Sequence, residues 1–385
     1  MIAMRSLLAA AVLALAVSVG LTSMASAAPR KVPRGFYGVM YDGALRAAPV
    51  ETQRKQFDLM ARSGVESVRT VISWNGVQPF PGGEFNFKGT DPTVQLAAER
   101  GMSVLPVLLF APPWARVLEN RQYSPPRTKP FQAFLQAAIR RYGTSGSFWA
   151  ENPTVPKRPV RDWQIWNEPN LEVDGRGIFW DAKRGTPSAY PRGYATLLRA
   201  SHRTIESTDR AARTVIGGIV GLSWLELRRL YRYRIKGYFD AMAVHVYPQT
   251  VDRVFGALRR VRNEMRAKGQ GRLPLYLTET AFPSSRGRVR PIAGQRQETK
   301  SGMARRLARL FTQATRDRRG LGLERVYWYT WSSGYRHPKS NFEYAGLLAA
   351  SRDGLSYKPQ PALAAFRRSA ARDQGCRKSV FGRCM

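Results

Sequence analysis

The chain has 385 residues, of which 43% are hydrophobic, enough for one well-packed core. Its 62 Lys and Arg residues against 27 Asp and Glu residues give a formal net charge of +35, and a surface of that charge attracts polyanions at low salt. The basic residues are spread along the whole chain, which is typical of a diffuse basic surface. Two cysteines are too few for a cysteine-rich metal cluster.

The first 28 residues have the three parts of a secretory signal peptide. Arg5 supplies the positive start, residues 7–19 form an apolar stretch too short to span a bilayer comfortably, and residues 25–27 form a small-residue cleavage site. We therefore expect cleavage after Ala27 or Ala28 and a secreted protein, with an uncleaved anchor as the alternative. Since no later segment is long and apolar enough to cross a membrane, we expect no integral membrane segment in the mature chain.

From residue 36 onward, apolar segments typical of buried strands alternate with segments of helical periodicity. The expected strands lie at residues 36–41, 66–73, 102–110, 161–166, 213–219, 239–246, 273–278 and 325–330. The expected helices lie at residues 50–62, 92–100, 131–142, 190–207, 224–233, 254–265, 303–314 and 361–371. The third strand is nearly all apolar, as in a strand that is buried on both faces.

Eight strands, each followed by a helix, predict a single α/β domain with the (β/α)8 TIM-barrel fold. A doubly wound open sheet would usually have fewer units and a glycine-rich phosphate turn after its first strand, and residues 38–41 do not form such a turn. We expect the domain to cover residues 29–371 and to be a monomer. In the basic tail, residues 372–385, we expect Cys376 and Cys384 to form a disulfide, with two free thiols as the alternative.

Two glutamates stand at the ends of predicted strands. Glu168 follows the fourth strand in the sequence Asn167-Glu168-Pro169, and Glu279 follows the seventh. Because parallel barrel strands end on one rim, both carboxylates should project into the same mouth. Cleavage of a glycosidic bond needs such a pair, separated by roughly 5–5.5 Å in retaining and roughly 6.5–9.5 Å in inverting enzymes. The sequence alone does not specify this separation.

The order of motifs closely resembles the retaining (β/α)8-barrel glycoside hydrolases of clan A, which include cellulase-like and β-xylosidase-like enzymes. The motifs run along nearly the whole mature chain: residues 64–69, 74–91 and 112–115, then Asn167-Glu168-Pro169, residues 245–247, Trp331 and residues 346–359. One feature departs from the pattern, since none of the three histidines lies near the end of the third strand. This departure favours a xylosidase-like or uncharacterised branch over the cellulase-like one.

The resemblance implies roles for individual residues. Glu168 would be the acid/base, and Glu279 the nucleophile. The resemblance also implies substrate-site roles for five further residues: Arg69 and Tyr247 as donors to Glu279, Asn167 at the sugar 2-hydroxyl, His245 in the network between sugar and nucleophile, and Trp331 as a flat apolar face. Each position also has a structural interpretation, which is capping or ion pairing for the charged residues and core packing for the others. We expect no metal and no other cofactor, since the sequence has no cluster of histidines and cysteines.

The predicted function is that of a secreted retaining glycoside hydrolase, which cleaves β-O-glycosidic bonds of an oligo- or polysaccharide through a covalent glycosyl-enzyme intermediate. The alternative is a non-catalytic barrel that binds cell-envelope or acidic polysaccharide. We expect no nucleic-acid partner, because the sequence has neither an RNA-recognition signature nor a basic helix with interleaved aromatics. Neither a His-Glu-x-x-His nor a Gly-x-Ser-x-Gly motif is present. The sugar itself is not encoded in any motif.

Overall fold

The computed structural model describes residues 29–173, 176–177, 179, 189–290, 297–334, 340–351, 353–354, 356–376, 379–380 and 383–384. The predicted signal peptide, residues 1–28, lies outside these residues and stays a prediction. The Cys376–Cys384 disulfide also stays a prediction, since the side chain of Cys384 lies outside the described part of the chain.

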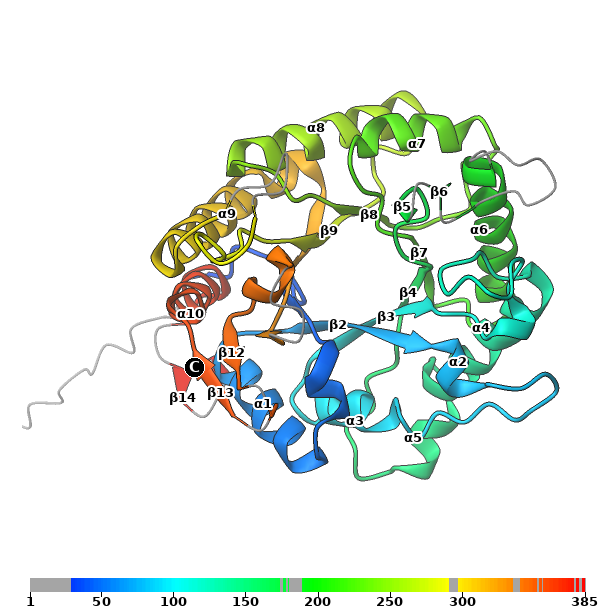
Figure 1. Cartoon of the computed structure of the whole chain (residues 1–385), viewed down its shortest axis with the longest axis horizontal. Helices are drawn as coiled ribbons and strands as arrows, with labels where there is room; N and C mark the ends of the chain where they lie inside the picture. The colour runs from blue at the N-terminus through cyan, green and yellow to red at the C-terminus, as the bar shows by residue number, and fades with distance from the viewer. Residues whose placement is uncertain are drawn as a thin grey trace, which may run out of the picture.

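Eight parallel strands form the centre of the molecule (Figure 1). They are β1 (Tyr37–Met40), β2 (Ser67–Ser73), β3 (Ser103–Leu109), β4 (Asp162–Ile165), β7 (Arg213–Ile216), β8 (Met242–His245), β9 (Leu275–Thr280) and β10 (Leu323–Trp328). Their order in the sheet is β7-β4-β3-β2-β1-β10-β9-β8. Single bridges from Val215 to Ala241 and from Ile219 to Val244 bring β7 beside β8, so the sheet nearly closes and the predicted barrel is confirmed.

An outer ring of helices surrounds the strands (Figure 1). Its members are α1 (Val50–Arg62), α3 (Asp91–Glu99), α4 (Thr128–Tyr142), α6 (Ala189–Thr208), α7 (Ser223–Tyr231), α8 (Val251–Ala267), α9 (Lys300–Leu321) and α10 (Pro361–Gln374). Each packs an apolar stripe on the barrel, as in α4, where Phe131, Phe134 and Leu135 are fully buried. None of the helices in the described ranges has both the length and the hydrophobicity that a membrane span requires.

Short elements occupy the segments that the sequence analysis left without structure. They are α2 (Trp74–Val77), α5 (Ser147–Glu151), the 3-10 helices η1 (Gly43–Ala47), η2 (Pro113–Ala115) and η3 (Asn341–Tyr344), and the short strands β5 (Glu172–Val173), β6 (Arg176–Gly177), β11 (Ser332–Ser333), β12 (Leu348–Ala350), β13 (Tyr357–Pro359), β14 (Ser379–Val380) and β15 (Arg383–Cys384). They are too short for hydrophobic periodicity to reveal them.

The last helix runs past the predicted domain boundary at residue 371. Helix α10 ends at Gln374, and the side chain of Asp373 is 1% exposed. Its Oδ2 accepts hydrogen bonds from the hydroxyls of Tyr37, at 2.6 Å, and Thr315, at 2.7 Å. These contacts tie the end of α10 to the first strand and to α9, so the packed domain includes residues that the sequence analysis assigned to the tail.

Candidate active site

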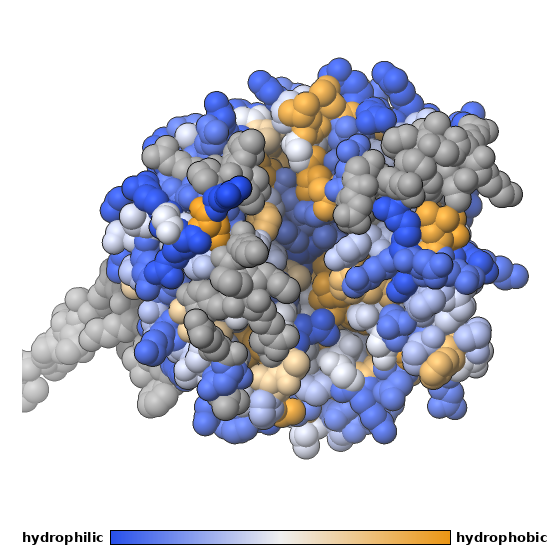
Figure 2. Space-filling view, in the orientation of Figure 1, coloured by the Kyte–Doolittle hydropathy of each residue, from blue (hydrophilic) through white to orange (hydrophobic). Residues whose placement is uncertain are grey.

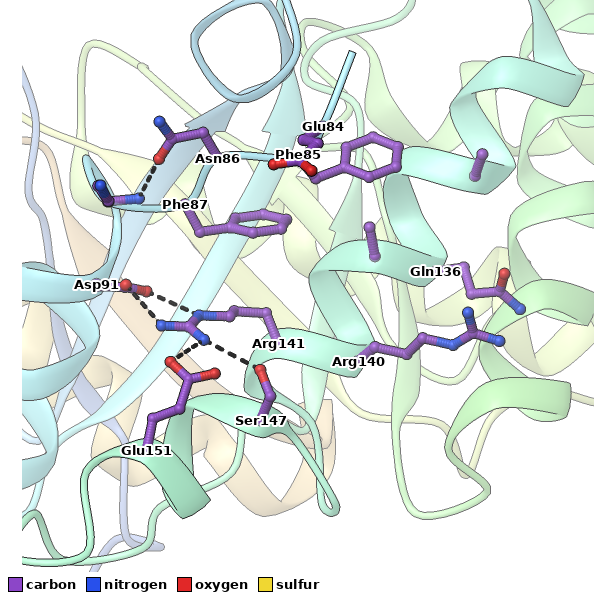
Figure 3. A pocket seen from close by; sticks show the side chains of 13 residues that line it. Glu84, Phe85, Asn86, Phe87, Asp91, Gln136, Arg140, Arg141, Ser147 and Glu151 are labelled. Atoms are coloured by element: carbon purple, nitrogen blue, oxygen red, sulfur yellow. Dashed lines mark hydrogen bonds and ion pairs between the residues drawn. The ribbon is translucent and has the colours of Figure 1, made fainter. Parts of the chain in front are cut away.

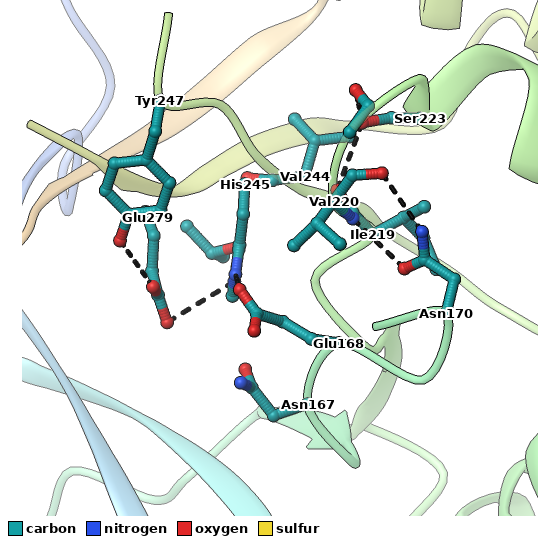
Figure 4. A network of polar contacts seen from close by, with 12 residues as sticks. Asn167, Glu168, Asn170, Ile219, Val220, Ser223, Val244, His245, Tyr247 and Glu279 are labelled. Atoms are coloured by element: carbon teal, nitrogen blue, oxygen red, sulfur yellow. Dashed lines mark hydrogen bonds and ion pairs between the residues drawn. The ribbon is translucent and has the colours of Figure 1, made fainter. Parts of the chain in front are cut away.

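Apart from Trp331, the predicted site residues come from four strands or the segments just after them and meet at one end of the barrel. Arg69 lies within β2, Asn167 and Glu168 follow β4, His245 ends β8, and Glu279 lies in β9. Figure 2 shows a hollow at the centre of this face with hydrophilic residues at its base, and Figure 4 shows the side chains that converge there. Sequence positions far apart are therefore neighbours, as the strand-end rule predicts.

The two glutamates lie close together. One carboxylate oxygen of Glu168, one of Glu279 and a ring nitrogen of His245 are all within 4.8 Å of one another. This separation is close to the roughly 5–5.5 Å typical of retaining pairs and below the roughly 6.5–9.5 Å of inverting pairs. The Glu279 side chain is 10% exposed and the Glu168 side chain 18% exposed, so both reach the cavity and Glu168 is the more open of the two.

Both oxygens of Glu279 accept hydrogen bonds. Arg69 donates from Nη1 to Oε1 at 2.6 Å. The Tyr247 hydroxyl donates to Oε2 at 2.6 Å (Figure 4). Burial by itself raises the pKa of Glu279, but the charges of His245 and Arg69 and these hydrogen bonds outweigh it and hold the pKa below its usual value. Glu279 is therefore ionised at neutral pH, as a nucleophile must be.

Arg69 connects three strands from inside the barrel. Its side chain is 1% exposed, its Nε donates to Gln164 Oε1 at 2.9 Å, and its Nη2 donates to Asn167 Oδ1 at 2.7 Å. Since arginine can only donate, the Asn167 oxygen faces Arg69 and the Asn167 amide nitrogen is left to donate elsewhere. Within the described part of the chain that nitrogen has no hydrogen bond, so it can serve a substrate hydroxyl.

His245 stands between the two carboxylates. Its Nδ1 lies 2.6 Å from Glu168 Oε1, and its Nε2 lies 3.5 Å from Glu279 Oε1 and 3.4 Å from Arg69 Nη2. Nδ1 therefore hydrogen-bonds Glu168, whereas Nε2 faces both the Arg69 guanidinium and the Glu279 carboxylate. The ring packs directly on Gly218, where an added Cβ would lie 1.9 Å from Nε2.

The loop that carries Glu168 has an uncommon backbone. Trp166 has a φ of +65° and Glu168 a φ of +46°, a left-handed conformation that costs a side chain roughly 1–2 kcal/mol. The Trp166 ring is 1% exposed. Asn170 clamps the loop through two bonds to Val220, one to its carbonyl oxygen at 3.0 Å and one from its amide at 3.1 Å (Figure 4). Packing and this clamp hold the strained backbone that turns Glu168 into the mouth.

The structure places Trp331 differently from its predicted role as a sugar platform. Trp331 is 1% exposed, and its indole nitrogen donates to Oε1 of Gln56 in helix α1 at 3.0 Å. Strand β10 ends at Trp328, so Trp331 lies beyond the strand and turns toward α1. The prediction was wrong, because a buried ring has no open face. Aromatic rings at the mouth instead come from Tyr247, Tyr329 and Phe342, whose centroids lie 5.0–6.1 Å apart.

A third acid at the mouth, Asp42, was missed by the sequence analysis. It lies two residues beyond Met40, the last residue of β1, and its Oδ1 accepts a hydrogen bond from the Thr330 hydroxyl at 2.8 Å. Burial raises the pKa of Asp42 to about 6, the Thr330 hydrogen bond opposes this rise, and the negative charge of Glu279 adds to it. The strand-end rule that singled out Glu168 would also have singled out Asp42.

Glu168, His245 and Glu279 also have the atom types and spacing of a metal-binding group. However, both Glu279 oxygens already accept hydrogen bonds, and the Arg69 guanidinium lies 2.6 Å from one of them. A second cation beside that guanidinium would be repelled. The arrangement fits an ion-paired nucleophile better than a metal ligand set.

Comparisons with known proteins agree with this architecture. The chain is 24% identical over 255 residues to a coniferin beta-glucosidase of Pinus contorta, a match that covers 56% of this chain and 47% of the relative. The chain thus spans about half the length of that curated relative. No protein-family model matches the sequence.

Solved structures resemble the chain over most of its length. A family 39 glycoside hydrolase from Bacteroides cellulosilyticus WH2 matches with a TM-score of 0.64 and 18% identity, covering 89% of this chain and 64% of its own. A monomeric beta-xylosidase from Caulobacter crescentus CB15 matches with a TM-score of 0.62 and 20% identity, covering 88% and 69%.

The chain has the barrel fold of these glycoside hydrolases. A family 1 beta-glucosidase from Thermotoga maritima shares it too, with a TM-score of 0.57 and 13% identity, and the match covers 90% of this chain and 99% of that one. The predicted resemblance to barrel glycosidases is therefore confirmed for the fold. Since a fold hosts many chemistries, the reaction has to follow from the side chains in the mouth.

Proposed function

We propose that this protein is a retaining glycoside hydrolase that cleaves a β-O-glycosidic bond by double displacement. The observation that carries the proposal is the short separation of two carboxylates with different surroundings. Oxygens of Glu168 and Glu279 lie within 4.8 Å of each other. Glu279 is held ionised by Arg69 and Tyr247, whereas Glu168 accepts no hydrogen bond from an arginine in the described part of the chain. One group is thus suited to attack and the other to proton transfer.

In the first step, a Glu279 oxygen attacks the anomeric carbon while the bond to the leaving oxygen breaks and Glu168 protonates that oxygen. In the second step, Glu168 takes a proton from water, the water oxygen bonds to the anomeric carbon, and Glu279 leaves as a carboxylate. The free Asn167 amide nitrogen would donate to the sugar 2-hydroxyl, a contact that strengthens in the transition state. Each proton released is taken up, so Glu168 ends each cycle protonated.

His245 acts on this pair as a positioning residue. Its Nδ1 is 2.6 Å from Glu168, and its Nε2 side faces Glu279 and Arg69. Because the His245 ring contacts both carboxylates, it fixes the distance between Glu168 and Glu279. Small displacements of such groups cost large factors in rate, because the reacting atoms must stay aligned.

A panel of chromogenic glycosides tests the activity, starting with β-xylosides and β-glucosides, the substrates named for similar proteins. We expect turnover by the wild-type protein and none by Glu279→Gln. The matched control is Glu66→Gln, since Glu66 precedes β2 at the opposite end of the barrel and pairs with Arg30. Equal activity of the wild type and Glu279→Gln would contradict the nucleophile assignment.

Two further measurements separate the roles. Proton NMR of the first product should show the anomer with retained configuration, whereas an inverted product would exclude a covalent intermediate on Glu279. Glu168→Ala should slow the release of poor leaving groups far more than of good ones, because only poor leaving groups need a proton. The same loss for both kinds of substrate would argue against the acid role.

The alternative, a non-catalytic barrel that binds polysaccharide, predicts binding without turnover across the panel. We also propose that the protein is exported, and residues 1–28 are the support for this. The N-terminal sequence of protein recovered from the culture medium should begin at Ala28 or Pro29. Recovery of the intact N-terminus only in cell membranes would favour an uncleaved anchor.

A further inference from the structure

A second cavity lies on the flank of the barrel, outside the ring of strands. It has a volume of about 880 Å³ and is bordered by the loop before α3, by α4 and by α5 (Figure 3). Ligand sites in proteins commonly measure roughly 300–1,000 Å³. Neither Glu168 nor Glu279 lines this cavity. It is therefore separate from the candidate active site.

The cavity has two chemically different sides. Figure 3 shows the rings of Phe85 and Phe87 on one side, with Gln136, Arg140 and Arg141 on the other. Phe87 is 7% exposed and anchored in the core, whereas Phe85 is half-buried. A sugar ring has the complementary shape, because its C–H faces are apolar and its edges carry hydroxyls. Aromatic rings with a few placed polar groups are the usual lining of such sites.

The polar side is held rigid before any ligand arrives. Arg141 donates two hydrogen bonds to Asp91, at 3.2 and 2.8 Å, one to Glu151 at 2.6 Å and one to Ser147 at 3.0 Å (Figure 3). Its side chain is 17% exposed. A wall fixed in this way loses little conformational freedom on binding, which favours affinity.

Other polar groups of the cavity are unused. In the part of the chain that the structure describes, the side chains of Glu84, Gln136 and Arg140 make no hydrogen bond or ion pair, although all three line the cavity. A carboxylate, an amide and a guanidinium offer both acceptors and donors. This mixture matches hydroxyl groups, each of which donates and accepts.

The charges around the cavity cancel. Its lining contains three cationic and three acidic residues: Lys88, Arg140 and Arg141 against Glu84, Asp91 and Glu151. This balance differs from the formal net charge of +35 for the whole chain. A polyanion would meet as much electrostatic repulsion as attraction here, whereas this balance of charges does not weaken the binding of a neutral ligand.

We propose that this flank cavity binds a neutral stretch of polysaccharide chain, as a second carbohydrate site remote from the scissile bond. The inference rests on the proposed function, since it assumes that the substrate or its parent polymer is long enough to reach both places. Phe85 supplies the stacking surface, and Glu84, Gln136 and Arg140 hydrogen-bond the hydroxyl edge. Such a site would raise affinity for the polymer without altering the chemistry in the mouth.

The test measures polymer binding with cleavage switched off. In the Glu279→Gln background, affinity for soluble xylan, mannan and mixed-linkage glucan is measured by affinity gel electrophoresis. We expect Phe85→Ala and Arg140→Ala each to weaken binding to at least one polymer by about fivefold or more, as for an anchoring contact. The matched control is Phe80→Ala: Phe80 is on the same loop, is 73% exposed and does not line the cavity.

Two outcomes would overturn the inference: no polymer binding by the parent, or equal binding by the parent and both cavity variants. Arg140→Ala keeps the test valid if Phe85→Ala folds poorly, since Arg140 is exposed. When Phe85→Ala and Arg140→Ala are made in the wild-type protein, each should retain the wild-type kcat/KM for a small aryl glycoside. If no glycoside is cleaved at all, the proposed function fails, but the binding comparison still decides the flank site.

Discussion

At the scale of single residues, the ionised state of Glu279 depends on two donors from different strands. Arg69 in β2 and Tyr247 after β8 each bond one of its oxygens at 2.6 Å. Removing Arg69 would leave a buried carboxylate without its counter-charge and would endanger the fold as well as the site. Tyr247 is the better probe, because its hydroxyl can be deleted with little change in shape.

We predict that Tyr247→Phe moves the acid limb of the pH profile of kcat/KM upward by about one pH unit. The hydroxyl stabilises the charged form of Glu279, so its loss raises the pKa of that carboxyl. Activity that requires the ionised form then falls off at a higher pH than in the wild type. Tyr327→Phe is the control, since its hydroxyl bonds Ser67 at the opposite end of the barrel, at 2.7 Å. An unmoved acid limb in Tyr247→Phe would contradict the assigned interaction.

Asp42 supplies a second prediction, on stability. Burial raises its pKa to about 6 in the folded protein, against about 3.9 in an unfolded chain. The folded state therefore binds the proton more tightly, so stability falls as the pH rises from about 4 to about 6 and the penalty is complete above that. Asp42→Asn should be more stable than the wild type at pH 8, by on the order of 1 kcal/mol, with no advantage at pH 4. Urea denaturation at both pH values measures this difference, and an equal effect at both would refute it.

At the scale of elements, the site depends on close contact between the segment after β7 and strand β8. His245 packs against Gly218 so closely that any side chain there would meet its ring. The sequence places Gly217 and Gly218 within the strand predicted at residues 213–219 but does not show what approaches them. Only the neighbouring strand, closing the barrel, explains why the position lacks a side chain.

We predict that Gly218→Ala lowers kcat by at least about tenfold, because it displaces His245 and with it Glu168. The comparison variant is Gly256→Ala in helix α8, where an added Cβ meets nothing within 4 Å. That change should leave kcat intact and stabilise the protein by up to about 1 kcal/mol through helix propensity. Steady-state kinetics and thermal unfolding on both variants provide the measurement. Normal activity in Gly218→Ala would mean that His245 does not position the acid.

The elements also show how far sequence periodicity reaches. The helix predicted at residues 50–62 coincides with α1, and the strand at 66–73 differs from β2 by one residue at its start. Both have long, regular apolar patterns that local side chains determine. The prediction for Trp331 was wrong because a local pattern does not specify the direction of its ring. That direction depends on Gln56 in α1, 275 positions away along the chain.

At the scale of the whole molecule, the charge of +35 and the chemistry of the mouth are separate properties. The basic residues are dispersed, whereas the Arg69–Glu279 pair is buried, with side chains 1% and 10% exposed. Salt screens exposed charges strongly and buried pairs weakly. A neutral substrate should therefore be insensitive to the surface charge.

We predict that kcat/KM for a neutral aryl glycoside changes less than about twofold between roughly 0.05 and 0.5 M salt. Retention on an acidic polymer, by contrast, should fall steeply over the same range. Parallel assays of hydrolysis and retention at each salt concentration make the comparison. A steep loss of hydrolysis would show that surface charge contributes to recognition of the substrate.

The sequence by itself determined the alternation of strands and helices and the placement of Glu168 and Glu279 on one rim, because both follow from local patterns and from the parallel direction of the strands. The tertiary structure alone decided the separation of their oxygens, the turn of Trp331 toward α1 and the cavity beside Phe85. These features depend on contacts between segments far apart in the chain, and no local pattern specifies how such side chains meet.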